Sequence, residues 1–182
     1  FKAQCLVTTL PGENKTLAMG CGGAKISPHP DCRFFTTDTG VLVASHDDGP
    51  GAATMATKDG VLYVFGNKGM ALFDVSNPGT QSLVKIGVTI NGKLEYKVNT
   101  GAIGDSSGAA AVVNKDFMYV AGGKGFLVFK VQDAKNPEKV GDVINTSALS
   151  ESGGAAMALK GDRLYLAGGH GLRVMGISTP EV

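Results

Sequence analysis

Three acidic residues take equivalent places in a repeated pattern and are the first candidates for binding chemistry. Asp48, Asp105 and Glu151 each stand three residues before the glycine of a Gly-Ala step, where a weaker fourth copy has Gly20. Carboxylates that converge on one point could hold a hard cation such as Ca²⁺, or a cationic side chain of a partner. Alternatively, Asp48 and Asp105 cap turns through their own backbone and Glu151 is simply solvated.

The histidines add little catalytic chemistry. His46, followed by Asp47 and Asp48, is the best local metal candidate, but one neighbour of each ligand type makes a weak pattern. No Ser, Cys or Asp stands at a spacing that identifies His29 or His46 as a general base. The glycine pairs lack the Lys-Ser/Thr of a phosphate-binding loop. The sequence therefore predicts a protein that is not an enzyme and holds no cofactor beyond the candidate Ca²⁺.

The cysteines bear on the cellular compartment. Cys5, Cys21 and Cys32 form an odd set, so at least one is unpaired or bonded to another chain. Cys21 and Cys32 could form a disulfide, which would leave Cys5. The sequons at Asn14 and Asn145, and a first residue other than Met, fit a chain that was exported or is a fragment. We expect an extracytoplasmic location: secreted, in a cell envelope or in an organelle lumen.

The amino-acid composition limits the classes of partner that the chain can bind. The chain has 182 residues, 43% of them hydrophobic, which is enough for a core of its own. Its 17 basic side chains nearly balance 16 acidic ones, so no basic tract is available for nucleic acid. No apolar run approaches the ~20 residues of a transmembrane helix. Other protein subunits or a small ligand remain as partners.

An internal repeat must position these residues. Each copy has Gly-Ala-Ala, a polar turn, a strand with a central tyrosine, a glycine turn, a second apolar strand and a proline. The copies begin at Gly51, Gly108 and Gly154, with tyrosines at Tyr63, Tyr119 and Tyr165, and a degenerate copy begins at Gly23. We expect the tyrosines to pack within the core rather than to form a stacking platform.

The repeat predicts an all-β fold, a small β-propeller in one domain that spans residues 1–182. Runs of Tyr, Val, Phe and Leu between glycine turns indicate strands. No stretch of the sequence shows the 3.6-residue apolar period that is typical of a helix. Units that start near residues 23, 51, 108 and 154 give intervals of 28, 57 and 46 residues. A four-stranded blade takes ~40–50 residues, so we expect four blades of which the first is truncated.

In the second and third units we expect an outer strand after the proline, within residues 81–88 and 139–145, whereas the fourth unit stops before such a strand. We expect residues 2–10 to fill that place and to close the ring, which would protect an edge strand. The competing interpretation is a fragment of a longer propeller.

The segment from Tyr119 to Pro137 resembles the LVIVD-repeat family of β-propellers, through Tyr-Val-Ala-Gly-Gly-x-Gly, Leu-x-Val-x-x-Val and Asn-Pro. The resemblance covers residues 51–180 well and 23–44 poorly. Kelch repeats share the double glycine, but this chain has no Trp. The resemblance implies a propeller in an extracellular or cell-envelope protein and brings no shared catalytic residues.

These observations favour a non-enzymatic protein-interaction scaffold, an accessory subunit of a larger extracytoplasmic assembly. The alternative is a lectin-like module that binds a small ligand or Ca²⁺ through the acidic residues. A hydrolase with a metal in the propeller funnel is the least favoured of the three.

Overall fold

A computed structural model describes residues 4–9, 16–21, 31–36, 42–47, 54–66, 69–76, 84–96, 98, 109–146, 148–149 and 155–177. In these ranges every regular element is a β-strand, and all the strand pairs are antiparallel. The prediction of an all-β chain is therefore confirmed. Nowhere in these ranges is there a helix of the length and apolar character needed to cross a membrane.

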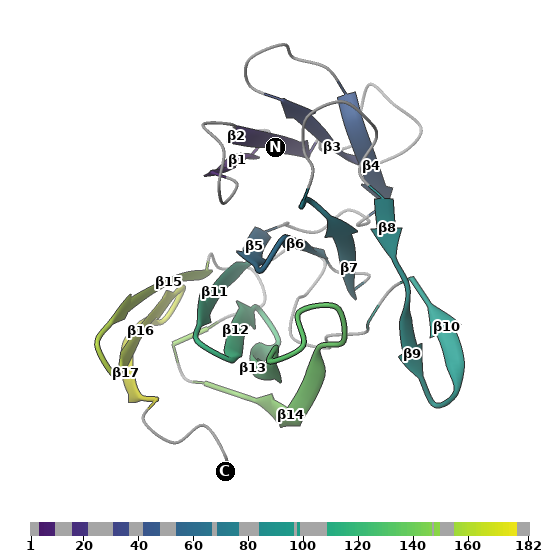
Figure 1. Cartoon of the computed structure of the whole chain (residues 1–182). Helices are drawn as coiled ribbons and strands as arrows, with labels where there is room; N and C mark the ends of the chain where they lie inside the picture. Colours follow the sequence, from purple (N-terminus) through teal and green to yellow (C-terminus); the bar gives the residue numbers. More distant parts are fainter. Residues whose placement is uncertain are drawn as a thin grey trace.

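The strands form several small sheets in which chain neighbours pair with each other (Figure 1). The first sheet contains β1 (Gln4–Thr9), β2 (Thr16–Cys21), β3 (Asp31–Thr36) and β4 (Leu42–Asp47). The second contains β5 (Thr54–Lys58), β6 (Val61–Gly66), β7 (Gly69–Asp74) and β8 (Val84–Ile86), followed by a separate hairpin of β9 (Val88–Ile90) and β10 (Lys93–Glu95). The third contains β11 (Ala110–Asn114), β12 (Phe117–Gly122), β13 (Gly125–Lys130) and β14 (Glu138–Ile144). The last has β15 (Ala155–Lys160), β16 (Arg163–Gly168) and β17 (Gly171–Gly176).

Turn residues set the ends of these strands. Asp59 and Gly60, between β5 and β6, both have positive φ, of 49° and 75°. Such a two-residue turn matches the right-handed twist of a β-hairpin, and Asp and Gly tolerate it best. The corresponding turns after β11 and β15 contain Lys115 at φ 52° and Gly161 at φ 60°. The repeated turn therefore gives each of these three sheets the same register.

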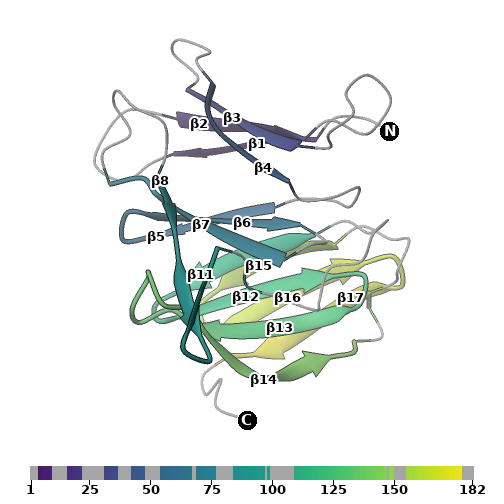
Figure 2. The same ribbon diagram turned by 90° about the vertical axis from the view of Figure 1, so that its right-hand side faces the viewer.

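The four larger sheets lie face against face in the order of the sequence (Figure 2). Their first strands contact one another in that order, β1 with β5, β5 with β11 and β11 with β15. Each sheet between two others must therefore bury both faces.

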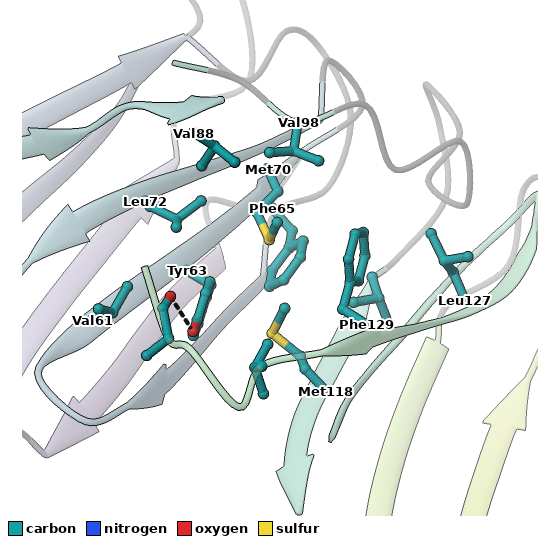
Figure 3. Packing of buried hydrophobic residues seen from close by; sticks show 13 residues of the cluster. Val61, Tyr63, Phe65, Met70, Leu72, Val88, Val98, Met118, Leu127 and Phe129 are labelled. Atoms are coloured by element: carbon teal, nitrogen blue, oxygen red, sulfur yellow. Dashed lines mark hydrogen bonds between the residues drawn. The ribbon is translucent and has the colours of Figure 1, made fainter. Parts of the chain in front are cut away.

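The second and third sheets share the largest core, drawn in Figure 3. The second sheet contributes the face that carries Tyr63 and Phe65, and the third contributes the face that carries Met118 and Phe129. All four side chains are buried because alternate residues of a strand point to opposite faces, and apolar residues fill both positions here.

The third and last sheets repeat this arrangement one sheet further along. Tyr119 and Phe126 of the third sheet pack against Leu164 and Leu166 of the last sheet. The rings of Tyr119 and Phe126 stack with their centroids 6.0 Å apart. In both interfaces the tyrosine-bearing face of one sheet therefore meets the next sheet along the chain.

The N-terminal segment differs from the expectation that it closes the last blade. Gln4–Thr9 is not paired with the last sheet but pairs with β2, in the register Gln4 opposite Cys21 to Thr9 opposite Thr16. A hairpin with a short connection loses little loop-closure entropy, whereas pairing residues 2–10 with the last sheet would close almost the whole chain. The unit expected to be truncated thus has four strands, and residues 31–36 form its third strand rather than its second.

The long second interval has a structural cause. The predicted outer strand within residues 81–88 is present as β8, and the hairpin of β9 and β10 follows it. This hairpin is fixed to the second sheet because Val98 exchanges backbone hydrogen bonds of 2.7 and 2.8 Å with Met70. The insertion accounts for the 57-residue spacing that no other unit has.

Candidate functional site

The acidic residues predicted to converge lie outside the described residues. Asp48, Asp105 and Glu151 all fall in ranges that the structure does not describe, so their role as Ca²⁺ ligands stays a prediction. In the part that is described, no group of three His, Cys, Asp or Glu residues could hold a metal ion. His170, in the turn after β16, is exposed, and its backbone N–H donates to the carbonyl of Ala148 at 3.1 Å.

The strand register brings Cys21 and Cys32 together. Cys21 of β2 is the direct partner of Cys32 in β3, whereas Cys5 is opposite Gly20. Directly opposed residues of antiparallel strands have Cα atoms ~4.5–5.5 Å apart, which is within the ~4.4–6.8 Å that a disulfide spans. This backbone spacing is compatible with a disulfide between Cys21 and Cys32, which stays a prediction, and Cys5 has a glycine as its direct partner.

We expect the oxidised protein to carry this one internal bridge. Its intact mass should be lower than that of the reduced protein by two hydrogen atoms, and a peptide map should join Cys21 to Cys32. Cys5 should react with a thiol-alkylating reagent before reduction. A map that links Cys5 to either of the others would contradict the pairing.

One of the two sequons falls on described structure. Asn145 follows β14 and is exposed, whereas Asn14 lies outside the described residues. An exposed Asn145 is accessible for glycosylation at this sequon.

The last sheet has one apolar face that no described residue covers. We call this face the outward face; it consists of Ala156, Ala158, Tyr165, Ala167, Leu172 and Val174, paired in two rows across β15, β16 and β17. Leu172 is 66% exposed and Val174 is 48% exposed. The other face of the same sheet is buried by the third sheet.

The outward face corresponds to faces that are buried elsewhere in the molecule. Tyr165 takes the place of Tyr63 and Tyr119, which are 0% and 2% exposed because the next sheet covers each of them. Burial supports the packing role predicted for these two tyrosines, whereas Tyr165 is only half-buried. The last sheet thus presents a surface of core type to its surroundings.

The edge of the last sheet also differs from the equivalent edges of the second and third sheets. In the second and third sheets the third strand pairs with a fourth, β7 with β8 and β13 with β14. Among the described strands, β17 pairs with β16 alone. An edge strand with free backbone donors and acceptors can receive another strand.

A hollow of about 410 Å³ opens between the third and last sheets. Residues 114–117 line one side, Gly161 and Asp162 line the other, and Tyr119 and Ile177 lie deeper. Its volume falls within the ~300–1,000 Å³ of small-ligand sites. The hydroxyl of Tyr119 has no hydrogen-bond partner among the described residues, and burial raises the pKa of Tyr119.

The equivalent place between the second and third sheets is filled. The Tyr63 hydroxyl donates to the backbone oxygen of Ala134 at 2.6 Å (Figure 3). The ammonium of Lys58 donates to the backbone oxygen of Lys115 at 2.8 Å and lies 3.4 Å from the carboxylate of Asp116. In the hollow, Asn114 takes the place of Lys58, so its short side chain leaves the facing groups unoccupied.

The repeat pattern alone does not predict this hollow, but two features of the sequence indicate it. The first is the change from Lys58 to Asn114 at equivalent ends of β5 and β11. The second is loop length, because a proline follows Val131 after six residues and Ile177 after three. The longer loop supplies Ala134 to Tyr63, and the last sheet has no loop of that length before its proline.

Comparison with known proteins gives the fold alone. No known protein family and no curated protein matches the sequence. A solved structure described as a functionally unknown protein from Desulfotomaculum acetoxidans DSM 771 is similar, with a TM-score of 0.56 and 13% sequence identity. The match covers 88% of this chain and 47% of the other, so the chain spans about half the length of that protein.

Proposed function

We propose that the chain is a non-enzymatic β-propeller scaffold that binds a partner protein on the outward face of its last sheet. The four larger sheets would be the blades, in line with the resemblance to LVIVD repeats and with the contacts between successive first strands. The location would be extracytoplasmic, and the chain would serve as an accessory subunit of a larger assembly.

The observation that carries this proposal is the contrast between equivalent faces. In two interfaces the tyrosine-bearing face is covered by the next sheet, whereas on the last sheet Leu172 and Val174 stay exposed. Burying such a surface contributes about 25 cal/mol per Å², which favours occupation of the outward face.

The chemistry of the partner follows from what covers the equivalent faces. The third sheet covers Tyr63 with Met118 and Val120, and the last sheet covers Tyr119 with Leu164 and Leu166. The partner would therefore present a β-sheet with a face of large aliphatic side chains.

A charge placed on the outward face tests this proposal. Val174→Lys should remove the partner, because a lysine ammonium cannot be buried without a counter-charge. Val84→Lys is the matched control, since Val84 is 68% exposed on β8, away from the outward face. Native mass spectrometry of the tagged chain from its own source should show a stoichiometric partner with wild type and with Val84→Lys.

Two results would overturn the proposal. One is recovery of the wild-type chain at its bare mass. The other is a partner that remains bound to Val174→Lys as well as to wild type, with both variants folded.

A further inference from the structure

We propose that the hollow between the third and last sheets binds a lysine-containing peptide segment, with a backbone carbonyl on the Tyr119 hydroxyl and an ammonium group at Asp162. This site is separate from the outward face and does not depend on the scaffold function. Two equivalent interfaces of the molecule, one filled and one hollow, point to this site.

The deep end of the hollow offers a hydrogen-bond donor. Tyr119 is 2% exposed, and its hydroxyl faces the hollow without a described partner. Among the described residues the buried side-chain polar atom without a partner is Thr146 Oγ1 and not the Tyr119 hydroxyl, so this hydroxyl reaches the open space of the hollow, where it can donate to a ligand. At the equivalent position the acceptor for Tyr63 is the backbone oxygen of Ala134, so a peptide carbonyl has the right chemistry.

The outer end favours a cation. Gly161 and Asp162 correspond to Lys115 and Asp116 of the filled interface. There the ammonium of Lys58 donates to the backbone oxygen of Lys115 and to the carboxylate of Asp116. The backbone supports this equivalence, because the N–H of Val131 donates to the backbone oxygen of Asp116 at 2.6 Å and the N–H of Ile177 donates to the backbone oxygen of Asp162 at 2.8 Å. Asp162 makes no ion pair with any described residue, so its carboxylate is available.

The filled interface has a lysine ammonium and a loop carbonyl at the places where the hollow has open space. Asn114 is too short to place an ammonium group where Lys58 places one in the filled interface. The loop over Tyr63 also differs in sequence, because Pro137 follows Val131 after six residues whereas Pro180 follows Ile177 after three. A peptide that carries both a carbonyl and a lysine would replace the two missing groups together.

The probe for this site is the chain's own loop as a free peptide. Gln-Asp-Ala-Lys-Asn-Pro, the sequence of residues 132–137, is made with blocked ends and titrated into the full chain by two-dimensional NMR. We expect saturable binding with shifts confined to the backbone amides around Tyr119 and Asp162. The same peptide with norleucine in place of lysine should bind about two- to fivefold more weakly, because an exposed ion pair contributes little.

Three variants of the protein sharpen the test. Tyr119→Phe should weaken binding about threefold to tenfold, the size of one neutral hydrogen bond. Asn114→Lys should abolish binding and raise the melting temperature, because the new ammonium can reach Gly161 and Asp162 as Lys58 reaches its own partners. Tyr63→Phe is the matched control; it should lower stability and leave the affinity for the peptide unchanged.

The outcomes separate this site from the outward face. Val174→Lys should bind the peptide as wild type does, whatever it does to a partner protein. Absence of saturable binding to the wild-type chain would overturn the inference. Equal affinity of wild type, Tyr119→Phe and Asn114→Lys would overturn it as well.

Discussion

Leu166→Ala should lower the free energy of unfolding by about 2–5 kcal/mol, the usual cost of truncating a fully buried leucine. Leu166 is 0% exposed and packs in the cluster that joins the last sheet to the third, together with Tyr119 and Phe126. The substitution leaves a cavity between two sheets that cannot readily close, because both are held by backbone hydrogen bonds. Urea unfolding of the purified chain, followed by circular dichroism, measures the difference.

Leu172→Ala is the matched control on the same sheet. The chemical change is identical, but Leu172 is on the outward face and 66% exposed, so we expect a change within about 0.5 kcal/mol. Similar losses for the two variants would mean that the outward face is covered in the isolated chain. Repeating the measurement at a second protein concentration would then show whether a second copy covers it.

The positions of the strands could be predicted from the sequence because they depend on local signals. Around Tyr63 and Tyr119, β-branched and aromatic runs alternate with Asp-Gly and Gly-Gly turns, and each of these favours a hairpin by itself. β8 and β14 were also expected near their observed places, within residues 81–88 and 139–145.

The partner of the N-terminal strand could not be predicted in this way. Composition shows that Gln4–Thr9 favours a strand, but it does not show which edge that strand joins. Pairing with β2 or with β17 would satisfy the same backbone groups. The choice depends on chain connectivity, and the short hairpin connection decided it.

The candidate sites depend on differences between copies rather than on the shared pattern. Aligning the repeats shows what Tyr63, Tyr119 and Tyr165 have in common, which is burial against the next sheet. The hollow arises where Asn114 replaces a lysine and where the sequence brings Pro180 closer to Ile177 than Pro137 is to Val131. The outward face arises where no described sheet follows. Both are properties of an interface and become visible only when two sheets are placed against each other.

Gly125→Ala should be the most destabilising of the glycine substitutions at the turns between second and third strands. Gly125 has φ of +142°, a conformation that costs a residue with a Cβ about 1–3 kcal/mol. A Cβ atom there would also lie 2.6 Å from the backbone oxygen of Ile144 and 2.7 Å from Val143 Cγ1. Both atoms belong to β14, so the clash adds about 1–3 kcal/mol of overpacking.

Gly171→Ala isolates the contribution of the fourth strand. Gly171 takes the equivalent place at the start of β17, with φ of +129°, but nothing lies within 4 Å of a Cβ built there. This variant should therefore show the cost of backbone conformation alone, and the difference between the two variants should be about 1–3 kcal/mol. Equal losses in urea unfolding would mean that a strand covers the edge of β17 in solution. A smaller loss for Gly171→Ala would show that this edge is open, and an open edge beside an apolar face is what a partner sheet needs in order to dock.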